Sequence, residues 1–267
     1  TISFSGKGLI GTIPNSLPQF FPFLQELNLR SNSISGTIPA GFVCDPNNPD
    51  GASKNMWKFG VDSNRLSGTL PSDECLANRS SEAQLQKFYV GNNLISGTIP
   101  AGFVCDPDNP DGASKNMQQF LVNSNRLSGT LPSDECLANR YSEAQLQKFY
   151  VGINLISGTI PAGFVCDPNN PDGASKNMRQ FGVDSNRISG TLPSDECLAN
   201  RSSEAKLQLF YANNNLISGT IPAGFVCDPN NPDGASQNML YFGVDSNRLS
   251  GTLPSDECFE RRTSSSR

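Results

Sequence analysis

The chain has 267 residues, of which 36% are hydrophobic and 17% charged, and its formal net charge is −5. No run of eighteen apolar residues is present, so no segment is expected to insert into a membrane. The basic residues are scattered and outnumbered by acids, which argues against nucleic acid and against anionic partners in general. The start at Thr1 lacks the charged and apolar regions of a signal peptide, which predicts a processed or excised chain.

A repeat organises the chain from its first residues. A partial unit, ISFSGKGLIGTIP, runs from Ile2 to Pro14, and the next, LQELNLRSNSISGTIP, from Leu24 to Pro39. The third, MWKFGVDSNRLSGTLP, runs from Met56 to Pro71. Steps of 32 and 29 residues then alternate, so near-identical double units recur every 61 residues and nine units fit. Such regular repetition has to be interpreted before any single motif.

Each unit contains one expected strand. In ELNLR at 26–30, Leu27 and Leu29 fall on one strand face, and the polar residues fall on the other. One unit cannot bury its own apolar edge, so the units must stack on one another. We therefore expect Leu27, Phe59, Phe88 and Phe120 to line up as successive inner residues.

An asparagine follows each expected strand from the second unit onward. Its amide can satisfy backbone groups where the strand turns, both within its own turn and in the next. We therefore predict a structural asparagine ladder, which consists of Asn32, Asn64, Asn93, Asn125, Asn154, Asn186, Asn215 and Asn247.

The units share the pattern L-x-x-L-x-L-x-x-N-x-L-S-G-x-I-P, which closely resembles the plant-type leucine-rich repeat with its L-S-G-x-I-P signature. The resemblance covers nearly the entire chain. It implies a β-rich, right-handed superhelix of the α/β leucine-rich-repeat type, with a parallel sheet on the concave face. It also implies a short second sheet on the S-G-T-I-P side and loops on the convex side. We expect one solenoid domain of about nine units over 1–258 and a disordered polar tail over 259–267.

Eight cysteines recur at two positions of the 61-residue unit. With no histidine to complete a mixed zinc site, they predict disulfides and an oxidising, extracellular location. An offset scheme, 75–105, 136–166 and 197–227, would leave two cysteines unpaired. We therefore favour the pairs Cys44–Cys75, Cys105–Cys136, Cys166–Cys197 and Cys227–Cys258. The sequons Asn78-Arg79-Ser80 and Asn200-Arg201-Ser202 also suit a secreted glycoprotein, although the copy Asn139-Arg140-Tyr141 lacks the acceptor.

The segment after each first cysteine, DPNNPDG at 45–51 in the first copy, is rich in turn-forming residues. Before it, Ser35–Pro39 is expected to form the second short strand and Phe42 to enter the core. The loop does not match an EF-hand, because Pro49 occupies a ligand position and no closing glutamate follows. We predict a rigid turn, no metal site and no cofactor.

Catalysis is disfavoured. The chain has no histidine, no G-x-S-x-G motif and no phosphate-binding glycine loop. Four Asp–Glu pairs, at 73/74, 134/135, 195/196 and 256/257, recur beside a cysteine at a convex turn, which predicts a solvated corner rather than a cleft. We expect a protein that is not an enzyme.

The first candidate surface is the concave face, where otherwise near-identical copies differ. Aromatic side chains beside hydrogen-bonding groups suit a protein or glycan partner, although exposed positions also drift after duplication. The candidate residues are Trp57, Lys58, Asp62, Tyr89, Asn123, Tyr150, Asp184, Tyr211, Tyr241 and Asp245. They predict an extracellular or cell-surface binding or adhesion module.

The second candidate surface is the S-G-T edge, where threonine fills one position in every unit and serine runs alongside. In a flat array these hydroxyls would lie about 4.8 Å apart between turns and about 6.6 Å apart along a strand. This resembles the threonine ranks of solenoid ice-binding proteins, so ice is the alternative partner. The file consists of Thr12, Thr37, Thr69, Thr98, Thr130, Thr159, Thr191, Thr220 and Thr252. A structural array in a cell wall or extracellular filament is a further alternative.

Overall fold

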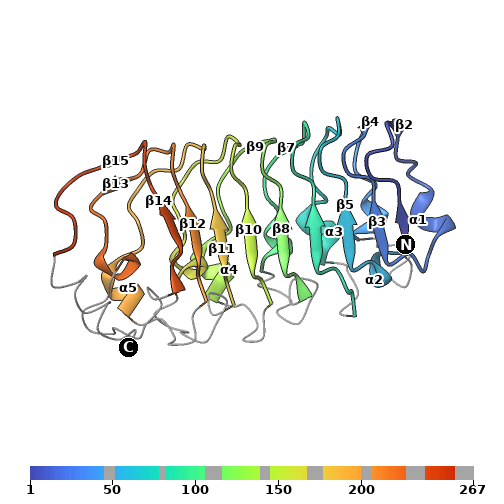
Figure 1. Ribbon diagram of the computed structural model, residues 1–267. Coiled ribbons are helices and arrows are strands. Elements are labelled where there is room, and N and C mark those ends of the chain that lie inside the picture. The colour runs from blue at the N-terminus through green and yellow to red at the C-terminus, as the bar shows by residue number, and fades with distance from the viewer. Residues whose placement is uncertain are drawn as a thin grey trace.

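The computed structural model describes residues 1–44, 52–77, 82–105, 116–138, 145–166, 177–199, 206–226 and 238–255. These residues form an elongated solenoid in which successive turns of the chain lie side by side (Figure 1). One parallel sheet runs along it with nine strands in the described part. The strands, in spatial order, are β1 (Ile2–Ser3), β3 (Glu26–Asn28), β5 (Lys58–Gly60), β6 (Lys87–Tyr89), β8 (Gln119–Leu121), β10 (Lys148–Tyr150), β11 (Gln180–Gly182), β12 (Leu209–Tyr211) and β14 (Tyr241–Gly243).

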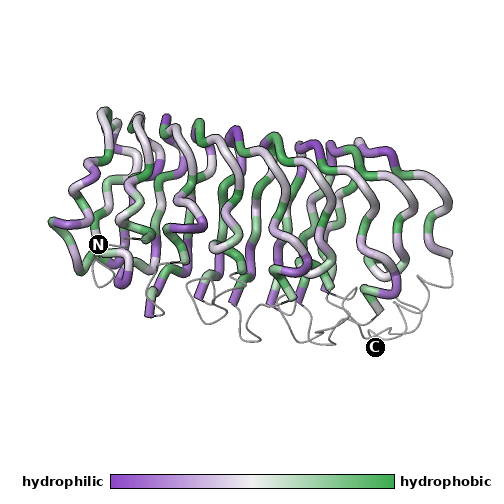
Figure 2. The backbone as a smooth tube through the Cα atoms, turned by 180° about the vertical axis from the view of Figure 1, so that it is seen from behind, coloured by the Kyte–Doolittle hydropathy of each residue, from purple (hydrophilic) through white to green (hydrophobic). Residues whose placement is uncertain are grey.

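The register of this sheet places equivalent residues of successive units beside one another. Leu27 pairs with Phe59, Phe59 with Phe88, and Phe88 with Phe120, which confirms the predicted inner file. Neighbouring phenylalanines of this file stack with ring centroids 5.5–5.9 Å apart. Apolar residues therefore recur at the same place in each turn, as Figure 2 shows.

A second phenylalanine file closes the core from the other side. Phe42, predicted to enter the core, is fully buried, as are its equivalents Phe103 and Phe225. These rings are tilted against the inner file, with centroids 4.6–5.9 Å apart. They come from the 3-10 helices η1 (Ala40–Phe42), η2 (Ala101–Phe103), η4 (Ala162–Phe164) and η5 (Ala223–Phe225). Aromatic pairs of this kind contribute about 0.5–1.5 kcal/mol each beyond their area burial.

The remaining helices are short. They are α1 (Leu17–Phe20), α2 (Ala52–Asn55), α3 (Asp73–Ala77), α4 (Asp134–Ala138) and α5 (Asp195–Ala199). Ser72 begins α3 as its cap, because its hydroxyl accepts a hydrogen bond from the backbone N–H of Cys75. None of the described helices has the length and apolar character needed to cross a bilayer.

The asparagine ladder is confirmed. From Asn64 to Asn247, each Oδ1 accepts a backbone N–H of the preceding turn at 2.9–3.0 Å. Each Nδ2 donates to a strand carbonyl of the preceding turn at 2.8–3.2 Å and also to carbonyls of its own turn. Each amide thereby closes its own corner and fixes the distance to its neighbour.

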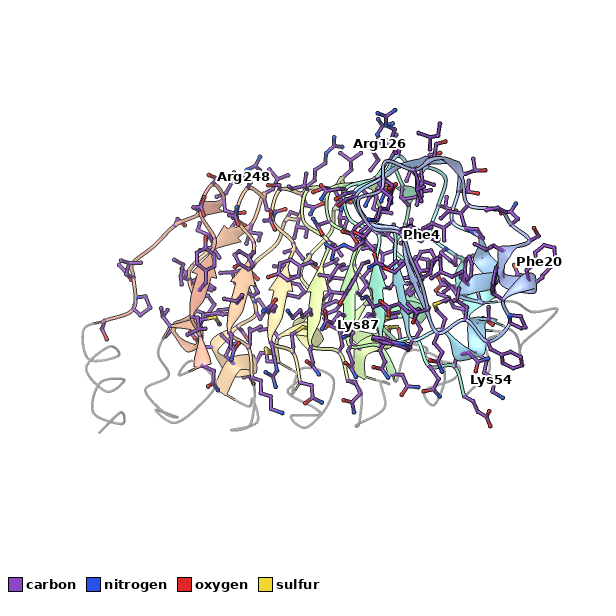
Figure 3. The ribbon with its side chains drawn as sticks, turned by 45° about the vertical axis from the view of Figure 1, so that its right-hand side comes forward. Phe4, Phe20, Lys54, Lys87, Arg126 and Arg248 are labelled. Atoms are coloured by element: carbon purple, nitrogen blue, oxygen red, sulfur yellow. A yellow bond between two sulfur atoms is a disulfide. The ribbon has the colours of Figure 1, made fainter. Side chains whose placement is uncertain are left out.

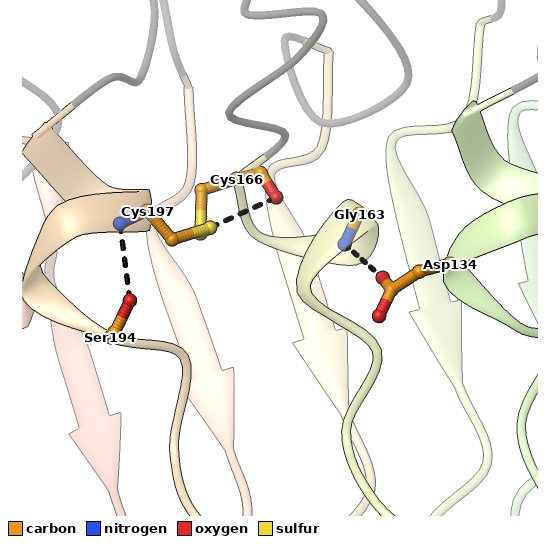
Figure 4. Close-up of a disulfide and its surroundings, with 5 residues drawn as sticks. All are labelled: Asp134, Gly163, Cys166, Ser194 and Cys197. Atoms are coloured by element: carbon orange, nitrogen blue, oxygen red, sulfur yellow. Dashed lines mark hydrogen bonds between the residues drawn. A yellow bond between two sulfur atoms is a disulfide. The ribbon is translucent and has the colours of Figure 1, made fainter.

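Three of the four favoured disulfides are confirmed: Cys44–Cys75, Cys105–Cys136 and Cys166–Cys197, with Cα atoms 5.6–5.7 Å apart. Each joins the end of a 3-10 helix to the short helix of the next turn (Figure 4). No cysteine of the described part is free. The predicted Cys227–Cys258 pair, the DPNNPDG turns, the sequons and the tail 259–267 lie outside the described residues.

The second sheet consists of two-stranded pieces along the S-G-T edge, and its strand in the second turn is Ser33–Ser35 rather than the predicted Ser35–Pro39. They are β2 (Ile10–Thr12) with β4 (Ser33–Ser35), β7 (Ser96–Gly97) with β9 (Arg126–Leu127), and β13 (Ser218–Gly219) with β15 (Arg248–Leu249). Isolated bridges continue this edge between Thr69 and Ser96, Thr130 and Ser157, and Thr191 and Ser218.

Candidate functional site

On the outer surface of the nine-stranded sheet, large and small side chains alternate, because the longer and shorter repeat units carry different residues at equivalent positions. At the last position of each strand, tyrosine and a small or apolar residue alternate between turns: Gly60, Tyr89, Leu121, Tyr150, Gly182, Tyr211 and Gly243. Two residues further along, the alternation is inverted from Asp62 to Asp184, with Asp62, Gly91, Asn123, Gly152 and Asp184, whereas Asn213 and Asp245 do not continue it. Bulky and minimal side chains therefore form a checkerboard.

The glycines of this checkerboard provide space for their neighbours. A Cβ added at Gly182 would overlap the ring of Tyr150, and one added at Gly152 would overlap the carboxylate of Asp184. Tyr150 and Asp184 thus lie flat over glycines of the adjacent turn. This explains why glycine occupies strand positions where it is normally unfavourable.

In the N-terminal half of the face, the alternating large and small side chains leave a hollow of about 390 Å³. It is lined by Arg30, Asp62, Tyr89, Gly91, Asn92, Leu121 and Asn123. Arg30 Nε lies 2.6 Å from Asp62 Oδ2, whereas Asp62 Oδ1 is buried without a hydrogen-bond partner. Tyr89 Oη donates a hydrogen bond to Gln119 Oε1 at 2.6 Å. Burial raises the pKa of Tyr89; the nearby Arg30 lowers it and Asp62 raises it further.

The C-terminal half carries a tyrosine cluster. The rings of Tyr150 and Tyr211 have centroids 5.9 Å apart, and those of Tyr211 and Tyr241 have centroids 4.7 Å apart. Burial, followed by the charge and hydrogen bond of Tyr211 and the charge of Asp184, raises the pKa of Tyr150. Burial also raises the pKa of Asp184. This half is therefore aromatic, with a carboxylate that is poorly solvated.

The predicted concave residues fall into four places. Asp62, Tyr89 and Asn123 share the hollow, and Tyr150, Tyr211 and Tyr241 form the cluster with Asp184 beside it. Trp57 lies apart, with Lys58 Nζ and Lys87 Nζ 5.9 Å and 5.2 Å from its ring centroid. Lys58 Nζ also lies 2.7 Å from Glu26 Oε1. Asp245 lines a second hollow at the last described strand, together with Tyr241 and Phe242.

The sequence prediction missed Arg30, Leu121 and Gln119. Arg30 lies one strand before the predicted set, and counting strand positions from Leu27 would have placed its side chain on the same face. Leu121 and Gln119 occupy the strand positions of Tyr89 and Lys87 in the next turn. Their part in the hollow depends on the side chains of the adjacent turn and has no signal of its own in the sequence.

The threonines of the S-G-T edge are all exposed, but the predicted register is wrong. Thr69 pairs with Ser96, and Thr130 with Ser157, so neighbouring turns are offset by two residues. The Thr69 methyl group lies 3.1 Å from the position of a Cβ on Gly97, whose φ is +84°. Seven serine hydroxyls of this edge donate to a glycine carbonyl of the preceding turn at 3.2–3.4 Å. The hydrogens of these seven serine hydroxyls are therefore not available to an external partner, whereas the exposed threonines make no such bond in the described part of the chain.

The acidic pairs of the convex turns have a structural use. Asp73, Asp134 and Asp195 each accept, through Oδ1, the backbone N–H of a glycine in the next 3-10 helix at 2.8 Å. Figure 4 shows this contact between Asp134 and Gly163. The described residues contain no group of three His, Cys, Asp or Glu side chains that could hold a metal ion.

Comparison with known proteins agrees with this architecture. The Leucine Rich Repeat family model matches residues 23–44. No curated protein sequence matches the chain at a significant level. A similar solved structure is the plant peptide hormone receptor RGFR1 in complex with RGF2: 24% identity, a TM-score of 0.60, and coverage of 92% of this chain and 35% of that one.

Two further structures are similar. The Arabidopsis receptor kinase HAESA, in complex with the peptide hormone IDA and the co-receptor SERK1, has 22% identity and a TM-score of 0.64, covering 92% of this chain and 37% of its own. A plant ice-binding protein has 20% identity and a TM-score of 0.58, covering 95% of this chain and 74% of its own. The chain thus spans little more than a third of the length of the two receptors. At these identities, the likeness shows the fold.

Proposed function

Because the chain is a plant-type leucine-rich-repeat solenoid, we propose that it is an extracellular module that binds a protein segment on its concave face. The three disulfides support the extracellular location. Two of the similar structures are receptors in complex with peptide hormones, which supports a peptide-like partner. The surface of this chain is the stronger argument.

The observation that carries the proposal is the checkerboard of tyrosines over glycines. It holds tyrosine side chains in fixed positions on the face, and tyrosine is enriched among binding hot spots. The hollow adds the Arg30–Asp62 ion pair and the amide side chains of Asn92 and Asn123, to which polar groups of a partner could bond. A partner bound along the solenoid would contact the charged hollow in the N-terminal half and the tyrosine cluster in the C-terminal half.

The dimensions suit an extended segment. Tyr89 on β6 and Tyr241 on β14 are five strand spacings apart, which corresponds to roughly 24 Å at about 4.8 Å per strand. An extended chain of about seven residues covers that length. The proposed partner is therefore a short extended protein segment with a basic or amide group near one end and apolar groups near the other.

The test is selection from a displayed library of random heptapeptides, followed by affinity measurement on soluble peptides. The double variant Tyr150→Ala with Tyr211→Ala should lose affinity about tenfold or more, since truncated hot spots typically cost that much. Thr130→Ala with Thr159→Ala, on the other edge, serves as a matched control and should bind normally. No enriched peptide, or an equal loss in both double variants, would refute the proposal. Capture of neutral glycans by the same tyrosines would instead identify a glycan partner.

Ice is the second candidate partner. The nine exposed threonines and the similarity to a plant ice-binding protein favour it, although the observed offset gives a different lattice from the flat array. Inhibition of ice recrystallisation should persist in Tyr150→Ala and disappear in Thr130→Tyr with Thr159→Tyr. Persistence of inhibition in the threonine variant would exclude this edge.

A further inference from the structure

One edge of the solenoid carries no acidic residue. It is the corner where each turn passes from the concave sheet to the S-G-T side, comprising residues 63–70, 92–99, 124–131, 153–160, 185–192, 214–221 and 246–253. The whole chain contains 25 acids and 20 basic residues, so such a stretch of surface is unusual for it. Four arginines lie on this edge, and Figure 3 shows Arg126 and Arg248 projecting from it.

Arginine and leucine alternate there from turn to turn. The seven residues, which we call the arginine edge, are Arg65, Leu94, Arg126, Leu155, Arg187, Leu216 and Arg248. All seven are exposed, and the leucines retain 38–43% of their accessible surface. In the described part of the chain, none of these arginines forms an ion pair.

The backbone holds these side chains at equal intervals. The N–H of Arg126 donates to Ile95 O at 2.8 Å, and that of Leu155 donates to Leu127 O at 2.7 Å. The other members of the arginine edge make the same bond to the preceding turn at 2.7–2.8 Å. The arginines are two turns apart, and each turn of this side is displaced by two residues relative to its neighbour, as in the pairing of Ser96 with Arg126. Because the same contacts recur in every turn, the four cations form a regularly repeating file.

Ile153 extends the apolar part of the edge between the turns of Arg126 and Arg187. It is 55% exposed and has φ +54°, a conformation that β-branched residues rarely adopt. Strained, exposed residues of this kind tend to gather at functional surfaces.

We propose that the arginine edge binds a linear acidic polysaccharide that lies along the solenoid axis. Guanidinium groups pair with carboxylate or sulfate oxygens through two parallel hydrogen bonds, and a polymer with repeating charges matches a file with repeating cations. The leucines between them offer apolar contact to the faces of the sugar rings. Each exposed pair is weak, but four of them on one polymer act together.

Two other anionic partners fit less well. The edge contains no aromatic residue, whereas proteins that bind single-stranded nucleic acid stack its bases on aromatic side chains. A membrane surface would require an apolar area rather than a single line of partly exposed leucines. The sequence argument against anionic partners does not hold for this edge, because folding brings arginines that are 61 residues apart into one line.

The experiment measures binding of the full chain to alginate, which carries carboxylates, to dextran sulfate and to neutral dextran, each at low and moderate salt. The variant Arg126→Gln with Arg187→Gln should lose affinity for the acidic polymer at least tenfold and show a weaker salt dependence. Lys54→Gln with Lys206→Gln removes the same charge from elsewhere and should bind normally. Urea unfolding of the arginine variant should match the wild type, since Arg126 and Arg187 are exposed. The same measurement on the lysine variant reports any stability lost with the Lys54–Glu82 ion pair.

The carboxylate and sulfate polymers identify which anion is preferred. The proposal is overturned by binding to neither polymer, by equal binding to neutral dextran, or by equal losses in both double variants. Tighter, arginine-dependent binding to anionic vesicles or to an oligonucleotide would assign the edge to that partner instead. Since Tyr150 and Tyr211 are unchanged in these proteins, failure here leaves the concave-face proposal to its own test.

Discussion

Replacing Ile153 by asparagine should stabilise the protein. Ile153 is the only β-branched residue among the eight non-glycine residues with positive φ in the described part of the chain. The equivalent residue in other turns is serine or asparagine, at φ values of 52–58°. The backbone cannot relax, because Ile153 N donates to Asp184 O at 2.8 Å and Asn154 N to Ser185 O at 3.2 Å.

The magnitude follows from the left-handed conformation. It costs an ordinary L-residue about 1–2 kcal/mol, whereas asparagine adopts it readily because its short amide hydrogen-bonds locally. Little packing is lost, since Ile153 is 55% exposed. We therefore expect Ile153→Asn to raise the free energy of unfolding by about 1 kcal/mol. With a urea m-value of about 2–3 kcal/mol/M, the midpoint should rise by roughly 0.3–0.5 M.

The chain offers a matched reciprocal variant. Asn92 has φ +53° at the equivalent position, so Asn92→Ile should lower the midpoint by a similar amount. Backbone strain at Ile153 is refuted if Ile153→Asn leaves the urea midpoint unchanged or lowers it, even though Asn92→Ile destabilises the protein. Such a result would mean that Ile153 makes stabilising contacts where asparagine cannot.

Two other variants test the concave face and the disulfides. Burial raises the pKa of Asp184, so its stabilising contribution is present below its unfolded pKa, about 3.9, and is lost as pH rises through the folded pKa. Asp184→Asn should therefore be more stable than the wild type at pH 7 and equally stable at pH 3, as measured by urea unfolding at both pH values. A difference in unfolding free energy that is the same at both pH values would contradict this. Cys105→Ser with Cys136→Ser removes a disulfide between residues 31 apart and should lower the free energy of unfolding by about 3 kcal/mol. Dithiothreitol should then lower the free energy of unfolding of the variant less than that of the wild type.

The stacked core could be predicted because its determinants repeat in the sequence. The period fixes which residues meet, so Phe59, Phe88 and Phe120 align once the units are aligned. The asparagine ladder and the three disulfides follow from the same alignment, since each cysteine pair is separated by one turn. These features depend on translation from turn to turn and on no detail of side-chain conformation.

The register of the S-G-T edge could not be predicted in this way. A translation of whole turns would place Thr69 beside Thr98, but the structure pairs Thr69 with Ser96. The left-handed Gly97 bends the chain, and the methyl group of Thr69 packs against it. The hollow around Asp62 was missed for a related reason, because its shape depends on the sizes of side chains in adjacent turns.

The alternation of two unit types gives both candidate surfaces a period of two turns. On the concave face it separates tyrosines by leucine or glycine, and on the arginine edge it separates arginines by leucines. Each added 61-residue copy would extend both files by one member. Affinity for a repeating polymer rises with the number of paired sites, whereas affinity for a single protein segment saturates once the segment is covered. The two proposals therefore differ in a measurable way: an added 61-residue copy should raise affinity for an acidic polymer and leave affinity for a seven-residue partner unchanged.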